Sequence, residues 1–249
     1  NTVVYDLTGK YIYPAFIDLY SDYGLPSSKK SKKGNEENHP NVKKEEPKKG
    51  AHGWNPAIHP EFKTQSKFNI DPKEAEELRK IGFGSVLTHY QDGIARGTAS
   101  LVSLDDESNN ISLLVGNATA WYSFKKGKSQ EEYPSSLMGS IALLRQTYYD
   151  AKWYQSNSTK EYNISLDAFN SIQSLPQFFD ATDYLTVLRA DKVGDEFGKQ
   201  YFFKGNGDEY KRITDIKNTN GKFIIPINYP KAFDVEDPYD ALLISLEDI

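Results

Sequence analysis

The 249-residue chain contains no cysteine and only four histidines. Without cysteine there can be no disulfide, no thiolate nucleophile and no zinc site with sulfur ligands. No apolar run approaches the roughly 18 residues of a membrane-spanning helix, and no signal peptide is visible. We therefore expect a soluble protein whose compartment is not determined by the sequence and for which export is possible.

A surplus of positive charge is also lacking, because the net charge is −5. This balance gives no reason to expect a nucleic-acid partner. Residues 27–50 hold eight Lys and four Glu without any hydrophobic periodicity. Since the glutamates interrupt the positive charge, we predict a flexible charged surface loop and not a basic docking arm.

The hydrophobic pattern predicts strands that alternate with helices. Residues 11–20 form a nearly continuous apolar run, which is typical of a strand buried on both faces. Asp71 and Pro72 begin one predicted helix, and Ser135 or Ser136 begins the strongest one. Beyond these helices, strands are predicted at 184–188, 201–203 and 223–227, with helical segments between them. This alternation indicates β-α-β units and a parallel sheet.

The N-terminal segment resembles the opening of the amidohydrolase superfamily, in particular its imidazolonepropionase-like members. There, a strand leaves a small β-sandwich and enters the first barrel strand through a Gly-Lys…Pro-Gly-Phe-Ile-Asp-x-His-x-His-x-Gly pattern. This chain matches the pattern at seven positions, namely Gly9, Lys10, Pro14, Phe16, Ile17, Asp18 and Gly24. The resemblance implies that residues 1–10 are a remnant of the sandwich and residues 11–249 are a barrel portion.

The expected fold class is α/β, with a partial, TIM-like (β/α) barrel built on a parallel sheet. A complete eight-stranded barrel typically needs about 250 residues. The charged loop and the N-terminal β fragment use part of this chain, so we expect fewer than eight barrel strands.

Metal-binding histidines are replaced at the positions that the resemblance identifies. In the family, imidazoles at the C-terminal ends of the strands hold one or two metals, which lower the pKa of a bound water to about 7. Those positions here are Tyr20, Asp22, Arg189 and Lys204. Because the two cations would repel a divalent ion, the resemblance implies no metal cofactor. Zinc or another divalent metal bound elsewhere is the alternative.

Other polar and aromatic residues are candidates for a pocket or a rearranged site. The pocket candidates are His52, Trp54, His59, His89 and Tyr90, and the candidates for metal-free catalysis are Asp22, Asp92 and Arg189. His89 directly follows a predicted strand and lies near Arg96 in the sequence, which places it on the functional face of a barrel. Structural packing is the simpler role for it. We interpret Asp191, Asp195 and Glu196 as acidic residues that stabilise a helix N-terminus.

Three functions are compatible with these patterns. The favoured one is a degenerate amidohydrolase-related domain without its own metal-dependent activity, which serves as a structural or regulatory part of a larger amidohydrolase chain or of a homo-oligomer. The second is a hydrolase of C–N bonds with a rearranged site, and the third is a small-molecule binding module.

Overall fold

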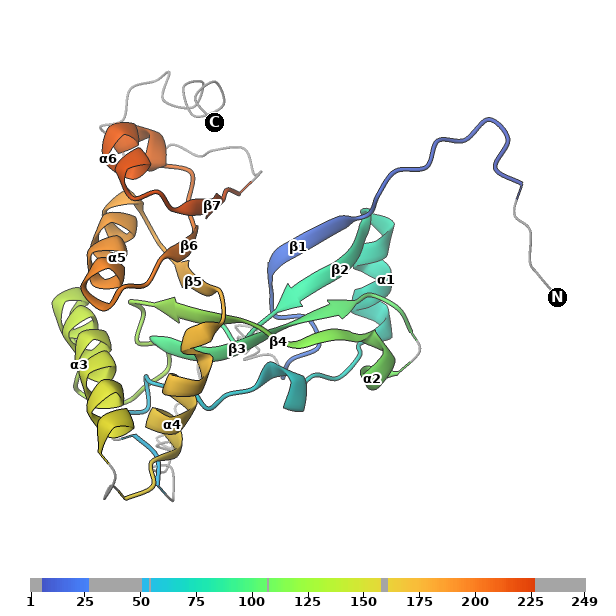
Figure 1. Cartoon of the computed structure of the whole chain (residues 1–249). Helices are drawn as coiled ribbons and strands as arrows, with labels where there is room; N and C mark the ends of the chain where they lie inside the picture. Colours follow the sequence, from blue (N-terminus) through green and yellow to red (C-terminus); the bar gives the residue numbers. More distant parts are fainter. Residues whose placement is uncertain (1–5, 27–50, 54, 107, 158–160, 227–249) are drawn as a thin grey trace, which may run out of the picture.

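A seven-stranded sheet is the centre of the computed structural model, which describes residues 6–26, 51–53, 55–106, 108–157 and 161–226. Figure 1 shows the strands crossing the molecule, with most helices gathered on one side. The strands are β1 (Phe16–Ser21), β2 (Phe83–Thr88), β3 (Ala95–Ser103), β4 (Leu113–Ser123), β5 (Gln177–Asp180), β6 (Tyr201–Lys204) and β7 (Lys222–Ile224).

Six α-helices and three 3-10 turns accompany the sheet. The α-helices are α1 (Pro72–Lys80), α2 (Asn109–Ser112), α3 (Leu137–Ser156), α4 (Ile164–Ser171), α5 (Tyr184–Phe197) and α6 (Ile213–Asn218). The 3-10 turns are η1 (Thr64–Ser66), η2 (Ile172–Ser174) and η3 (Glu209–Arg212). Both helix starts predicted from capping residues are confirmed: Asp71 accepts from two backbone N–H groups of α1, and Ser136 accepts from the N–H of Gly139. None of these helices is long and apolar enough to cross a bilayer.

The strands follow one another across the sheet in chain order, from β1 to β7. β1 runs parallel to β2, and β4 to β7 run parallel to one another. β2, β3 and β4 form an antiparallel meander. The six residues between β2 and β3 are too few for a helical crossover, so an antiparallel turn is the available connection. Within the described chain β1 and β7 each pair on one side only, which makes the sheet an incomplete barrel with fewer than eight strands, as expected.

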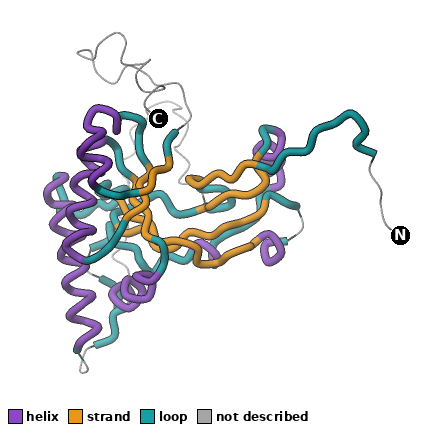
Figure 2. The backbone as a smooth tube through the Cα atoms, turned by 45° about the horizontal axis from the view of Figure 1, so that its top comes forward, coloured by secondary structure: helices purple, strands orange, loops and turns teal. Residues whose placement is uncertain are grey.

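Helices α3, α5 and α6 cover the outer face of the sheet, as Figure 2 shows. Because side chains alternate along a strand, Tyr201 and Phe203 point from β6 into this layer. They join a core that includes Tyr122, Tyr148 and Phe169. The Tyr148 and Tyr201 hydroxyls lie 2.8 Å apart, which provides each buried phenol with a partner.

The opposite, inner face carries a second apolar cluster. Trp121, Phe178 and Phe202 come from β4, β5 and β6 and stack in sequence, with centroid separations of 5.0 Å and 4.8 Å. His89 extends the stack beyond Trp121, with its ring centroid 3.9 Å from the indole. A row of four rings therefore crosses the inner face and defines one wall of the barrel mouth.

The N-terminal prediction needs correction. Strand β1 begins only at Phe16, and residues 11–15 are exposed and extended without strand pairing. Both Phe16 and Ile17 are exposed, although the apolar run predicted a strand buried on both faces. The physical reason is that β1 is an edge strand in the described part of the chain, where β2 is its one pairing partner. The predicted loop 27–50 and residues 1–5 of the predicted sandwich remnant lie outside the described residues.

The strand predicted at residues 184–188 is also wrong, because this segment begins helix α5. Asp183 caps the helix by accepting from the N–H of Thr186 at 2.7 Å, and Gly198 ends it in the left-handed conformation. The parallel strand lies earlier, at β5. An apolar run of five residues does not distinguish a strand from the first turns of a buried helix.

Candidate functional site at the strand ends

The carboxylate of Asp180 lies at the C-terminal end of β5, and its side chain is only 2% exposed. Phe178, two residues earlier on the strand, belongs to the inner aromatic cluster, so the alternation of β5 directs Asp180 to the same face. A buried carboxylate requires compensating charges or donors. We therefore take Asp180 as the centre of the candidate site.

Arg96 provides the closest charge partner. Its Nη1 atom lies 3.1 Å from Oδ2 of Asp180, and its side chain is 1% exposed. β3 runs antiparallel to the strands beside it, so its first residues lie at the edge where the parallel strands end. The Nε–H of Arg96 donates to the carbonyl of Gly93 at 3.1 Å, which fixes the orientation of the guanidinium.

Three further groups surround the same carboxylate. The Tyr20 hydroxyl at the end of β1 donates to Oδ2 of Asp180 at 3.0 Å. Lys204 at the end of β6 places its ammonium 3.7 Å from Oδ1, and Lys125 lies 4.0 Å from Oδ2. Three cations thus face one carboxylate, which leaves the cluster with an excess of positive charge.

Tyr20 remains a neutral donor in this arrangement. Burial and the neighbouring Asp180 charge raise the pKa of Tyr20 to about 12. Its ring also lies beneath the Lys204 ammonium, 4.9 Å from the centroid, in a cation–π contact. Tyr20 therefore contacts the carboxylate through its hydroxyl and the cation through its ring.

His89 occupies the apolar side of the site. The ring is buried, and among the described residues neither Nδ1 nor Nε2 has a hydrogen-bond partner. The indole Nε1 of Trp121 is likewise buried, and no group in the described part of the chain hydrogen-bonds to it. Burial, followed by the nearby Arg96 charge, holds the pKa of His89 well below its usual value, so the imidazole is neutral.

The family resemblance implied four replaced metal positions, Tyr20, Asp22, Arg189 and Lys204. Of these, the structure brings Tyr20 and Lys204 together at Asp180. Asp22 is exposed, and its charge acts instead on Glu74 of α1. Arg189 was predicted at a strand end but lies in the middle of α5, near Asp183. The strand position assigned to Arg189 is therefore wrong, and Asp180 is the residue at the end of the corresponding strand.

The other candidates lie at neighbouring loops. Asp92 accepts from the backbone N–H of Lys128 at 2.9 Å, which fastens the loop after β4. The Tyr90 ring stacks on Phe62 at 4.5 Å and meets the His59 ring edge-on at 6.1 Å. These contacts give Asp92 and the aromatic rings packing partners around the rim of the site. Trp54 lies outside the described residues.

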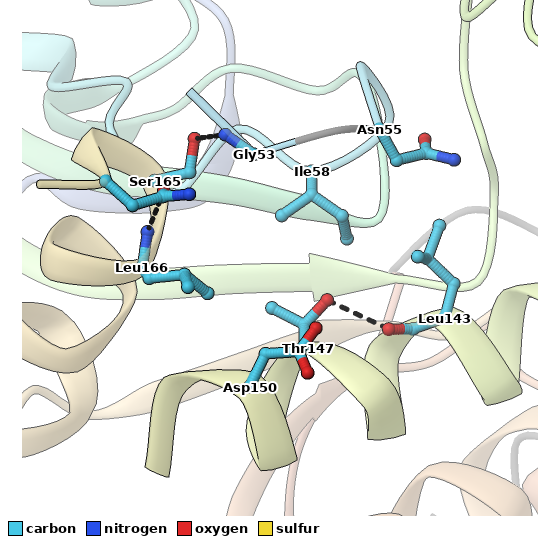
Figure 3. A pocket seen from close by; sticks show the side chains of 9 residues that line it. Gly53, Asn55, Ile58, Leu143, Thr147, Asp150, Ser165 and Leu166 are labelled. Atoms are coloured by element: carbon cyan, nitrogen blue, oxygen red, sulfur yellow. Dashed lines mark hydrogen bonds between the residues drawn. The ribbon is translucent and has the colours of Figure 1, made fainter. Parts of the chain in front are cut away.

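His52 belongs to a separate region beside α3 and α4. Its Nδ1 lies 3.8 Å from Glu61, which also accepts from the Ser165 hydroxyl at 3.2 Å. The N–H of Gly53 donates to the same hydroxyl at 2.9 Å, as Figure 3 shows. The adjoining cavity of about 50 Å³ has room for about one or two waters, not a substrate. It is lined by Gly53, Asn55, Ile58, Leu143, Thr147, Asp150, Asn163, Ser165 and Leu166.

The acidic residues after Arg189 do not lie at a helix N-terminus, which corrects their interpretation. Asp191, Asp195 and Glu196 all lie in the second half of α5. Glu196 forms a two-point ion pair with Arg145 of α3, at 2.6 Å and 2.7 Å. Burial and the charge of Asp195 raise the pKa of Asp191 to about 6. These carboxylates belong to the contact between helices and to the helix surface.

Sequence reasoning did not single out Asp180 or Lys125. One signal was available: residues 176–180 read Pro-Gln-Phe-Phe-Asp, a short apolar run that follows a proline and ends in an acid. Lys125 offered no signal, because its approach to Asp180 depends on where the loop after β4 turns.

The comparisons with known proteins agree with this architecture. No protein-family profile matches the sequence, and no curated protein matches it significantly. The crystal structure of an amidohydrolase from Thermotoga maritima superimposes with a TM-score of 0.69 at 18% sequence identity. The match covers 95% of this chain and 62% of the Thermotoga chain, so this chain spans less than two thirds of its structural neighbour. The chain therefore has an amidohydrolase-like fold.

Proposed function

We propose that this chain is a degenerate amidohydrolase-like barrel segment that does not perform metal-dependent hydrolysis by itself and acts as a structural or regulatory part of a larger assembly. The observation that carries the proposal is the set of groups around Asp180. Arg96, Lys204 and Tyr20 surround the carboxylate that could otherwise bind a metal. The imidazolonepropionase-like pattern at the N-terminus is consistent with this origin and belongs to the same proposal.

The residues at the strand ends do not fit a divalent metal. A zinc or manganese ion next to Asp180 would stand close to a guanidinium and an ammonium, and like charges repel strongly in a buried site. Within the described residues no group of three His, Asp or Glu side chains is arranged to hold a metal. The His89 imidazole is stacked on the Trp121 indole and contacts the Tyr20 ring of this cluster, and one imidazole does not make a nitrogen-rich metal site.

An exposed apolar edge supports the proposal of a partner. β1 pairs only with β2, and the N-terminal segment before it projects away from the sheet in Figure 1. An unpaired strand edge with apolar neighbours needs covering. We propose that the remainder of a larger amidohydrolase chain or a second copy of this chain covers it. The exposed apolar residues here are Leu7, Tyr11, Ile12, Tyr13, Phe16, Ile17, Leu19 and Ile81.

The alternative, a hydrolase of C–N bonds with a rearranged site, has no specific observation in its favour. A metal-free mechanism would need Asp22, Asp92 and Arg189 to act together. They are instead engaged separately with α1, with the backbone of Lys128 and with the surroundings of Asp183.

Calorimetric titration of zinc and manganese into the chelator-treated protein tests the proposal. The expected result is no saturable binding in the wild type and none in Asp180→Asn. Stoichiometric binding that is lost in Asp180→Asn or His89→Phe would show that the strand ends hold a metal after all. Sedimentation velocity of the wild type and of Ile17→Lys tests the β1 edge, because a charge at this exposed position would weaken association between copies.

A further inference from the structure

The strand-end cluster contains more positive charge than Asp180 neutralises. Lys125 is 57% exposed and Lys204 is 26% exposed, so solvent reaches both ammonium groups. Their distances to the Asp180 carboxylate, 4.0 Å and 3.7 Å, are ion-pair contacts that exceed hydrogen-bond length. In the described residues the Lys125 ammonium contacts Asp180, and the Lys204 ammonium contacts Asp180 and the Tyr20 ring. Both ammonium groups therefore keep donors that an acceptor from solution can reach.

Buried polar atoms without hydrogen-bond partners in the described residues gather around the Tyr20 ring, which lies 5.0 Å from the His89 ring, 5.5 Å from the Trp121 ring and 4.9 Å from the Lys204 ammonium. They are Nδ1 and Nε2 of His89, Nε1 of Trp121, and Nη1 of Arg96 and Oδ1 of Asp180, each of which makes an ion-pair contact without a hydrogen bond. Buried polar atoms are satisfied in most proteins by protein groups, water or ligands. The indole and guanidinium N–H groups among these atoms are donors without acceptors, so together with the solvent-facing lysines they indicate a site for an anionic acceptor, because core packing alone would leave them unsatisfied at a cost.

The wall next to these groups is aromatic. Phe202 is partly exposed and ends the row of stacked rings that starts at His89. Lys222 of β7 holds its ammonium 5.3 Å above the Phe202 ring, which adds another cation on the inner face. A planar apolar body can pack on Phe202 and on the half-buried Tyr20 ring while its charged end meets the lysines.

We propose that the barrel mouth binds a small organic anion, with its carboxylate or phosphate between Lys125 and Lys204 and its apolar body against Tyr20 and Phe202. The proposal goes beyond the proposed structural role, since it assigns a ligand class to the non-metal site. Arg96 and Asp180 then act as the buried pair that positions Tyr20 and Lys204. Recognition by two ammonium groups favours an anion strongly over its neutral isostere.

Calorimetry at low salt with benzoate as the probe tests the proposal, with phenyl phosphate and benzamide titrated in parallel. We expect one saturable site for benzoate or for phenyl phosphate, and the tighter of the two identifies the anionic group. Benzamide is expected to bind at least about tenfold more weakly. Lys204→Met and Lys125→Met should each weaken anion binding about tenfold.

Lys126→Met is the matched control, because Lys126 is adjacent in sequence but donates to the carbonyl of Glu131 at 2.8 Å. It should leave anion binding unchanged. The proposal is overturned by no saturable binding of either anion, by equal binding of benzamide, or by equal losses in all three lysine variants. Metal uptake in the zinc titration would overturn the proposed function independently, whereas failure to bind anions without metal uptake would overturn this inference alone.

Discussion

Arg96 and Asp180 form an ion pair of 3.1 Å whose two side chains are almost completely excluded from solvent. The pair joins the start of an antiparallel strand to the end of a parallel one. Such a pair fixes the geometry of the strand ends, because neither charge can be left alone in a buried site. The other groups of the site, Tyr20 and Lys204, are arranged around it.

Removing one partner of this pair should destabilise the fold strongly. Arg96→Met leaves the Asp180 charge buried with only the more distant ammonium groups, and we expect a loss of about 3–5 kcal/mol in the free energy of unfolding. The double variant Arg96→Met with Asp180→Leu should recover much of this loss, since no charge remains uncompensated. Urea denaturation of the wild type, Arg96→Met, Asp180→Leu and the double variant measures both effects. Additive losses in the double variant would contradict the account.

Gly97 of β3 allows the segment around Phe62 to pack closely against this strand. Its φ is +77°, and a Cβ built there would lie 2.0 Å from the carbonyl oxygen of Phe62. Gly97→Ala should therefore cost more than the roughly 1–3 kcal/mol of left-handed strain alone. Gly198→Ala is the matched control, because Gly198 also has positive φ (+64°) but open space around it. Equal losses of unfolding free energy in the two variants would show that the close approach to Phe62 does not matter.

Asp191 gives the fold a pH dependence of known sign. Burial and the Asp195 charge raise its folded pKa to about 6 from 3.8. The folded state then binds the proton more tightly than the unfolded state does. Ionisation of Asp191 therefore lowers the free energy of unfolding, and this loss is absent at low pH and grows as the pH rises from about 4 through about 6. Asp191→Asn should raise the urea midpoint at about pH 8 and change it little at about pH 4. A gain of equal size at both pH values would exclude titration of Asp191 as its source.

His89 should produce the opposite dependence. Its folded pKa is depressed, so the unfolded chain takes up the proton more readily once the pH falls below about 6.5. The free energy of unfolding is therefore unaffected by His89 titration above about pH 6.5 and decreases progressively below this pH. In His89→Phe, which keeps a ring against Trp121, the acid loss of stability should be smaller than in the wild type. Parallel stability curves for the two proteins between about pH 7 and 5 would contradict this role.

The capping residues predict the starts of α1 and α3 correctly. Asp71 with Pro72, and Ser136, mark helix starts through side-chain hydrogen bonds that depend only on local sequence. The position of His89 directly after a strand was also predictable, because β2 ends at Thr88. Local chemistry determines both features.

Other parts of the site could not be predicted, because they depend on contacts between distant segments. Tyr20 and Asp180 are 160 residues apart in sequence, and their hydrogen bond requires the sheet to place β1 and β5 correctly. The sequence predicts a strand at the beginning of α5, since a short apolar run is compatible with a strand and with the first turns of a helix. That error placed Arg189 in the site and left Asp180 unnoticed.

Elemental analysis of the purified, undialysed protein tests the central claim most directly, namely that an ion-pair cluster centred on Asp180 replaces a metal centre at the strand ends. The account predicts no stoichiometric zinc, iron or manganese in the wild type. One or two equivalents of any of these metals per chain, reduced in Asp180→Asn or His89→Phe, would contradict it.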